Sequence, residues 1–341
     1  GSDDWLEGFH VFLQALEEEA DLHLLGRLMT RSDILRWLEA RLGIEAAYAQ
    51  HPEIEDEVID QPVVITGLPR SGTSILFELL AQDMRFGSPR NWEMMFPYPP
   101  PEAAHYHNDP RIARCEHLVT QWKRVVPSYA TMHEMGAEIP NECIVAMSCT
   151  FRSENLPGQY QIPRYNSVNV VFERGQRTLL KAPSHLGNLS VLFQVFPDAR
   201  VVITHRDPIV AQASVTNLLG TLYWMRSSKA FDARAFESLM TPEAGAARLN
   251  AVIDLLQSGL LPNGQLHSFL YHDLIQEPLP ALANLFQALG MPLDAAGRNA
   301  MQAYLSRKPQ GKFGRHEYSV TDAQRQLYQR YQTFFSVPDE A

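Results

Sequence analysis

The segment "VVITGLPRSGTSILFELLAQ", residues 63–82, limits more than any other what this chain can fold into. Its first four residues are an apolar, β-branched run that predicts a buried strand, and the apolar residues of 73–81 recur at helical spacing. Gly67 and Gly72 bracket a tight loop between these two elements. Because a strand, a glycine loop and a helix in this order direct backbone amides toward an anion, the segment predicts a phosphate-binding loop.

The loop departs from the version that binds nucleoside triphosphates, which reads G-x-x-x-x-G-K-[ST]. Its two glycines keep the spacing of that pattern, but Thr73 stands at the lysine position and Arg70 lies inside the loop. Ser71 and Ser74 add hydroxyl groups around the start of the helix. We therefore predict an anion site whose charge comes from an arginine. The alternative is an ordinary strand-to-helix turn of an α/β protein.

The rest of the chain alternates apolar runs with helical patterns. The runs that predict strands are 168–173, 178–181, 201–204 and 266–271. The helical patterns lie at about 186–196, from 207 onward and at 279–289. Strands that alternate with helices predict an α/β fold with a parallel central sheet and helices on both faces.

Two stretches outside this alternation are predicted to be helical. Residues 1–58 carry leucines among acidic residues, and we expect an N-terminal helical extension that packs on the core. Residues 59–341 form the predicted α/β domain. Within that domain, 84–165 are expected to be a mostly helical insertion over the sheet edge where a ligand would bind.

Charge and composition exclude several classes of function. The 29 Lys and Arg residues against 39 Asp and Glu residues give a net charge of −10, so we expect no nucleic-acid partner. No apolar run approaches the roughly 18 to 20 residues of a membrane span, so no integral membrane segment is expected. The three cysteines lack metal-ligand or redox spacing, which predicts a cytoplasmic compartment and no metal site. The sequence leaves the oligomeric state open.

The segment "HRDPIVAQAS", residues 205–214, holds a second group of candidates. Arg206 ends a predicted strand at the edge where open parallel sheets bind ligands, and Asp207 caps the next helix. Ser214 lies seven residues after Asp207, which is two turns along the helix, so Arg206 and Ser214 can flank one phosphate. Taken alone, the same residues also fit a surface arginine and a helix-packing serine.

The segment "LLKAPSHL", residues 179–186, holds a third group. Lys181 ends a buried strand at the same sheet edge, and His185 starts the next helix. A lysine in that position can also be just the first solvated residue of a strand, and His185 an ordinary residue of a helix start. The pattern of this segment alone does not decide between these readings.

Together the three segments resemble the sulfotransferases that use 3′-phosphoadenosine 5′-phosphosulfate (PAPS), and in particular their bacterial branch. The loop at 67–74 resembles that family's 5′-phosphosulfate loop, and the spacing of eight between Arg206 and Ser214 matches its 3′-phosphate motif. "YHDLIQEP", residues 271–278, is similar to the Y-x-D-L-x-x-x-P segment of bacterial and Golgi-type members. The resemblance extends from about residue 62 to residue 341.

The resemblance implies PAPS as the sulfonyl donor, 3′-phosphoadenosine 5′-phosphate (PAP) as the product, and no metal. It implies that Arg206 and Ser214 hold the 3′-phosphate and that Tyr271 lies near the adenosine. The 5′-phosphosulfate is assigned to the loop residues Arg70, Ser71, Gly72, Thr73 and Ser74. "GKFGRHEYS", residues 311–319, partly resembles the family's C-terminal phosphate-contacting segment, which adds Lys312 and Arg315 as candidates. It departs from the R-K-G-x-x-G pattern of cytosolic members.

The implied reaction is an in-line transfer to a hydroxyl or amine of a small-molecule, lipid or glycan acceptor, with Arg70 and Lys181 stabilising the leaving phosphate. Two residues are candidates for the base. Glu93, in "RNWEM", lies where Golgi-type tyrosylprotein sulfotransferases place their glutamate, and it is the favoured candidate. His185 resembles the histidine of the cytosolic K-[ST]-H arrangement, with three residues between Lys181 and His185 in place of one. The competing functions are a P-loop kinase or nucleotide hydrolase, and a non-catalytic nucleotide-binding protein of the same fold.

Overall fold

The computed structural model describes residues 3–163, 165, 179–232, 241–308 and 321–340. The chain divides into two units. Unit 1 comprises residues 1–58, 89–174 and 217–235, and unit 2 comprises 59–88, 175–216 and 236–341. The chain passes from one unit to the other several times, and one of these boundaries falls within α10 (Pro208–Trp224).

Unit 2 is built on a four-stranded parallel sheet in the order β2-β1-β3-β4. The strands are β1 (Val63–Gly67), β2 (Leu179–Lys181), β3 (Arg200–His205) and β4 (Leu266–Leu270). In the register of the sheet, Val64 of β1 pairs with Leu180 on one side and Val201 on the other. The prediction of an α/β fold with a parallel sheet is confirmed. The strand predicted at 168–173 lies outside the described residues.

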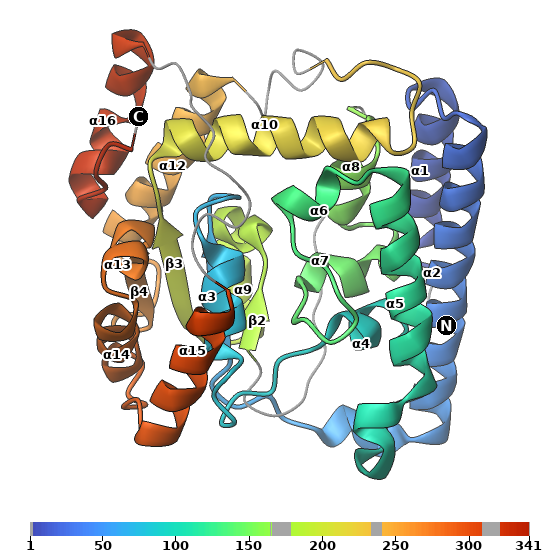
Figure 1. Cartoon of the computed structure of the whole chain (residues 1–341), viewed down its shortest axis with the longest axis horizontal. Coiled ribbons are helices and arrows are strands. Elements are labelled where there is room, and N and C mark those ends of the chain that lie inside the picture. Colours follow the sequence, from blue (N-terminus) through green and yellow to red (C-terminus); the bar gives the residue numbers. More distant parts are fainter. Residues whose placement is uncertain (1–2, 164, 166–178, 233–240, 309–320, 341) are drawn as a thin grey trace. The chain divides into compact units, whose positions relative to one another are not determined.

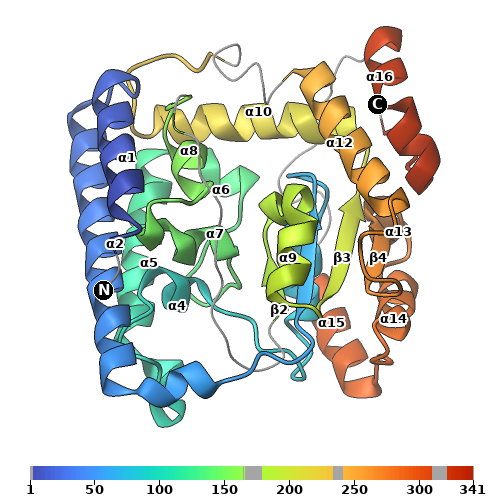
Figure 2. The same cartoon turned by 180° about the vertical axis from the view of Figure 1, so that it is seen from behind.

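Helices cover both faces of this sheet, because successive residues of β1 point to opposite faces and all of them are buried. α3 (Thr73–Leu80) lies on one face and α9 (Leu189–Val195) on the other (Figures 1 and 2). The other helical elements of unit 2 are η4 (Pro183–Asn188), α12 (Pro242–Gln257), α13 (Tyr271–Gln276), α14 (Pro278–Ala288), α15 (Ala295–Arg307) and α16 (Asp322–Phe335).

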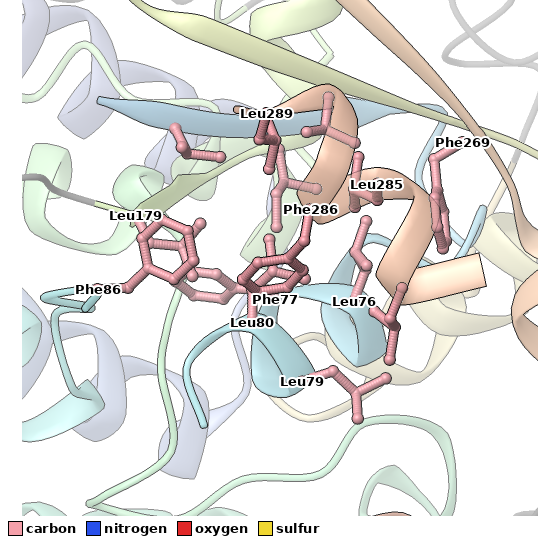
Figure 3. Packing of buried hydrophobic residues seen from close by; sticks show 14 of the residues in the cluster. Leu76, Phe77, Leu79, Leu80, Phe86, Leu179, Phe269, Leu285, Phe286 and Leu289 are labelled. Atoms are coloured by element: carbon pink, nitrogen blue, oxygen red, sulfur yellow. The ribbon is translucent and has the colours of Figure 1, made fainter. Parts of the chain in front are cut away.

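The core on the α3 face holds the phosphate-loop helix in place. Figure 3 shows leucine and phenylalanine side chains of α3 and α14 packed together beneath the strands. Each fully buried side chain of this kind contributes roughly 1.5–3 kcal/mol. The labelled members are Leu76, Phe77, Leu79, Leu80, Phe86, Leu179, Phe269, Leu285, Phe286 and Leu289. The N-terminus of α3 is thereby fixed at the end of β1.

Unit 1 is helical in its described parts and has its own core. Phe12, Trp37, Phe151 and Tyr160 are buried together, with the rings of Phe12 and Tyr160 5.4 Å apart. Its elements are α1 (Leu6–Glu18), α2 (Leu24–Gln50), η1 (Pro52–Asp56), α4 (Asn91–Met95), η2 (Ala103–Asn108), α5 (Pro110–Val125), α6 (Tyr129–Met132), α7 (Cys143–Ala146), η3 (Met147–Thr150) and α8 (Asn155–Gln159).

His205, the last residue of β3, makes the stability of unit 2 depend on pH. Its ring stacks on Phe335 with centroids 3.9 Å apart, and its Nδ1 lies 2.7 Å from the Tyr331 hydroxyl. Burial lowers the pKa of His205 from 6.5 to about 3. The folded protein therefore keeps this ring neutral in a pH range where the unfolded chain protonates it.

We expect the free energy of unfolding to fall as pH is lowered from about 6.5 toward 3, because the unfolded state binds the extra proton. The contribution of one such group approaches about 1.4 kcal/mol per pH unit in that window. Denaturant titrations at several pH values should give a shallower slope for His205→Gln than for wild type. The slopes are compared rather than the absolute stabilities, because the substitution also removes the ring stacking. Identical slopes would contradict this assignment.

Candidate functional site

The loop between β1 and α3 has a backbone conformation that requires glycine at position 72. Gly72 adopts φ +92°, and a Cβ there would lie 2.4 Å from Cδ2 of Tyr271. A side chain at this position would be both strained and in collision with an aromatic ring. Arg70, in the same loop, adopts the left-handed φ of 68°, which turns the chain sharply before α3 begins.

Ser71 braces the loop against the sheet. Its hydroxyl is buried, donates to the carbonyl of Leu68 at 2.6 Å and lies 2.6 Å from the Thr204 hydroxyl of β3. Thr73, the first residue of α3, is buried as well. The Ser71 side chain thus links the loop to the neighbouring strand β3.

Arg70 is held between two residues that the sequence predicted for the same sheet edge. Its Nε donates to the Ser214 hydroxyl at 3.0 Å, and its carbonyl accepts from Nη1 of Arg206 at 3.1 Å. These three residues come from the β1–α3 loop, from α10 and from the residue after β3. The structure therefore joins the first and second sequence groups into one polar cluster at the carboxyl end of the strands.

Tyr271 completes this cluster. It is the first residue of α13, directly after β4, and its ring centroid lies 4.5 Å from the guanidinium carbon of Arg206. A guanidinium over an aromatic face is held in a cation–π interaction. Tyr271 therefore supports Arg206 on one side and packs against Gly72 on another.

Lys181 and His185 follow the edge strand β2. Lys181 is 2% exposed, and its Nζ donates to the Ser74 hydroxyl at 3.2 Å, so the end of β2 meets the start of α3. His185 is buried in η4. The Thr66 hydroxyl of β1 donates to the Ala182 carbonyl at 3.0 Å and fixes the segment between Lys181 and His185.

Glu93 lies in unit 1, in the first turn of the short helix α4. Its carboxylate accepts a hydrogen bond from the backbone N–H of Arg90 at 2.7 Å, as in a capping box, and one from the Tyr106 hydroxyl at 3.0 Å. Burial, followed by the negative charge of Glu93, raises the pKa of Tyr106 to about 12. Glu93 therefore has a local structural role besides any chemical one.

Some contacts at the site were missed by the sequence reasoning. Glu340 forms an ion pair with Arg206, and Arg325 forms one with Asp207. No local pattern indicates either pair, because each joins residues more than a hundred positions apart. Lys312 and Arg315 lie outside the described residues. Among the residues that are described, no group of three or more His, Cys, Asp or Glu side chains is arranged to hold a metal ion.

Comparison with known proteins decides the family. Residues 62–295, which is more than half of the chain, match the sulfotransferase family. The chain belongs to that family. The resemblance seen in the three sequence segments is thereby confirmed.

Similar sulfotransferases come from mycobacteria. Omega-hydroxy-beta-dihydromenaquinone-9 sulfotransferase Stf3 of Mycobacterium bovis is 26% identical over 314 residues, covering 81% of this chain and 73% of that protein. The Mycobacterium tuberculosis protein of the same name gives the same values. The crystal structure of STF1 from M. tuberculosis H37Rv is 27% identical with a TM-score of 0.76, over 98% of this chain and 93% of that one. STF9 from Mycobacterium avium, at 23% identity, shares the fold with a TM-score of 0.80, over 100% and 93% of the two chains.

Within the part of the chain that the structure describes, none of the helices has both the length and the apolar character needed to cross a membrane.

Proposed function

We propose that this sulfotransferase uses PAPS as its donor and transfers the sulfonyl group to a hydroxyl or amine of its acceptor. The observation that carries the proposal is the cluster of Arg70, Arg206 and Ser214, which joins three separate elements at the carboxyl end of the sheet. PAPS carries phosphate groups at both its 5′ and 3′ positions. Arg70, in the phosphate loop, and Arg206, directly after β3, are in contact and supply one positive charge for each of these two phosphate positions.

Each residue of the cluster has a proposed role. Arg70 and the backbone of residues 70–74 bind the 5′-phosphosulfate. Arg206 and Ser214 bind the 3′-phosphate, and Tyr271 lies against the adenosine. Lys312 and Arg315 remain proposed as further phosphate contacts, on the resemblance alone.

In the proposed reaction, an acceptor oxygen or nitrogen forms a bond to sulfur as the bond between sulfur and the oxygen bridging it to the 5′-phosphate breaks. The electron pair of that bond stays on the phosphate, which leaves as PAP, and the acceptor's proton passes to a base. Negative charge grows on the leaving phosphate, so Arg70 and the buried cation of Lys181 are proposed to stabilise it. Glu93 and His185 are the proposed candidates for the base.

Among these acceptors, alcohols are the first to test, beginning with a hydroxylated lipid. Support for this class comes from Stf3, whose name states an ω-hydroxylated menaquinone derivative as its substrate. Small-molecule and glycan alcohols form the other arms of the same screen. Incubation with PAPS and each acceptor class, followed by mass spectrometry, should detect the mass of an added sulfonyl group in one arm.

Binding of PAP tests the donor assignment. Arg206→Ala is expected to weaken PAP binding about 10- to 100-fold, because a charge-assisted contact is worth roughly 1.5–3 kcal/mol. Binding of adenosine 5′-monophosphate (AMP), which lacks the 3′-phosphate, should change much less in the same variant. Isothermal titration calorimetry measures both ligands, and Arg298→Ala, at an exposed position of α15, serves as the matched loss of one positive charge.

Two results would count against the proposal. One is undiminished PAP binding by a folded Arg206→Ala protein. The other is a protein that binds ATP with Mg²⁺ in preference to PAP, which is expected of a P-loop kinase.

A further inference from the structure

The guanidinium of Arg206 is bound by a carboxylate from far along the chain. Its Nε lies 3.0 and 2.9 Å from the two carboxylate oxygens of Glu340, and its Nη2 donates to Oε2 at 2.8 Å. Nη1 donates to the Arg70 carbonyl at 3.1 Å. The edge of Arg206 formed by Nε and Nη2 is therefore occupied by Glu340.

The backbone of Glu340 is anchored close to Arg206. Ser336 ends α16 with φ +56°, which turns the chain back, and the Val337 amide donates to the Gln332 carbonyl at 2.9 Å. The Glu340 amide then donates to Oδ2 of Asp207 at 2.9 Å. The carboxylate of Glu340 is thus held within reach of Arg206 by its main chain, while its side chain remains 24% exposed to solvent.

The neighbouring carboxylates of Asp207 and Asp339 form ion pairs with another arginine, whereas Glu340 forms its ion pair with Arg206. Asp207 is the other carboxylate at this position, and it forms its own ion pair with Arg325 at 2.9 Å. Arg325 also pairs with Asp339, the neighbour of Glu340, at 2.9 Å. Within the described part of the chain, Glu340 is thus the carboxylate seen in an ion pair with Arg206.

A carboxylate and a phosphate use the same guanidinium edge in the same way, through two parallel N–H···O bonds. They cannot share that edge without strong repulsion between like charges. If Arg206 binds the 3′-phosphate, Glu340 has to leave first. A pair of this kind at a partly exposed position is weak, so a phosphate dianion can displace the carboxylate.

We propose that Glu340 is a residue of the nucleotide site, which occupies Arg206 until the 3′-phosphate displaces it. The proposal rests on the proposed role of Arg206. Its consequence is that Glu340 competes with bound PAP for Arg206 and so favours release of the product. Product release limits turnover in many enzymes, so such a competitor can affect the overall rate.

Nucleotide titrations with charge-removing variants test this role. Glu340→Gln keeps the size of the side chain and removes its charge. It is expected to tighten PAP binding about three- to tenfold, which corresponds to slightly more than the free energy of a partly exposed ion pair. Binding of AMP should stay within twofold of wild type, because AMP has no 3′-phosphate to compete with Glu340. Asp339→Asn removes the adjacent charge, which pairs with Arg325 and not with Arg206, and should leave PAP binding at the wild-type value.

The double variant Arg206→Ala/Glu340→Gln shows whether the effect passes through Arg206. If it does, removing the Glu340 charge gives no gain in PAP affinity once Arg206 is absent. An equal gain without Arg206 would indicate a general charge effect and overturn the proposal. Unchanged or weaker PAP binding in Glu340→Gln alone would also overturn it, since Glu340 would then only orient Arg206.

The failures of the two proposals can be told apart. If Arg206→Ala binds PAP as tightly as wild type, the proposed donor site is wrong and the displacement of Glu340 is wrong with it. If Arg206→Ala loses PAP binding while Glu340→Gln has wild-type affinity, the donor site stands and only the displacement is rejected.

Discussion

Lys181→Met is expected to slow sulfonyl transfer about 10²- to 10³-fold at saturating PAPS, the size of effect seen when a group that stabilises transition-state charge is removed. Lys181 is buried at the end of β2, with its Nζ 3.2 Å from the Ser74 hydroxyl of the phosphate-loop helix. A buried cation interacts strongly with charge that develops near it, because little water screens the interaction. Methionine retains the length of the side chain and removes only the charge, so the packing around Phe77 should survive.

Two controls accompany this variant. Titration with PAPS in the absence of acceptor should give an affinity within a few-fold of wild type, since the charge that Lys181 offsets grows mainly during transfer. Ser74→Ala removes the hydroxyl that Lys181 contacts but keeps the cation, and its turnover should fall by less than about tenfold, the cost of one hydrogen bond. Wild-type turnover of Lys181→Met would show that this lysine is structural.

The fold could be predicted where the signal is local. The β-branched run of β1, its glycine loop and the apolar spacing of α3 are adjacent in the chain, and each element has the pattern of a strand or helix buried in a parallel α/β sheet. The same holds for β3 and the start of α10, where Asp207 accepts a hydrogen bond from the Ile209 amide as an N-cap residue does. The location of the candidate site then follows, because parallel strands bring their carboxyl ends to one edge of the sheet.

The parts of the candidate site that depend on tertiary contacts could not be predicted. Arg206 and Glu340 are 134 positions apart, and Pro338, two residues after the turn at Ser336, indicates the end of a helix but not which residue the chain then contacts. The sequence predicts Ser71 as part of an anion site, but it does not indicate the contact of its hydroxyl with Thr204 on the neighbouring strand. Short polar side chains have many possible partners, and only the folded chain selects one.

The hydrogen bonds of Glu93 could not be predicted from the sequence either. The resemblance to Golgi-type sulfotransferases implied a base at this position, whereas the Glu93 carboxylate accepts hydrogen bonds from the Arg90 amide and the Tyr106 hydroxyl. Arginine is not among the side chains that indicate an N-cap, so no local pattern predicts that Glu93 accepts from the Arg90 amide. A structural role for Glu93 and a chemical one are compatible, and kinetics has to separate them.

If Glu93 is the base, Glu93→Gln should retain PAPS binding and lose turnover about 10²- to 10⁴-fold, because an amide cannot accept the acceptor's proton. Glutamine serves in a capping box as well as glutamate, so α4 should keep its shape. His185→Asn should then cost much less, acting only through packing in η4. Tyr106→Phe removes one hydrogen bond to Glu93 but leaves its carboxylate, and serves as the matched control for local disturbance.

If His185 is the base, the two variants exchange their effects: His185→Asn loses turnover and Glu93→Gln retains most of it. Single-turnover rates at saturating PAPS, measured across pH, distinguish the two cases. Loss of the base removes the acidic limb of the pH–rate profile, whereas a purely structural defect lowers the rate at every pH by the same factor. Near-normal turnover in Glu93→Gln, with its acidic limb intact, would reject Glu93 as the base and leave His185 as the remaining candidate.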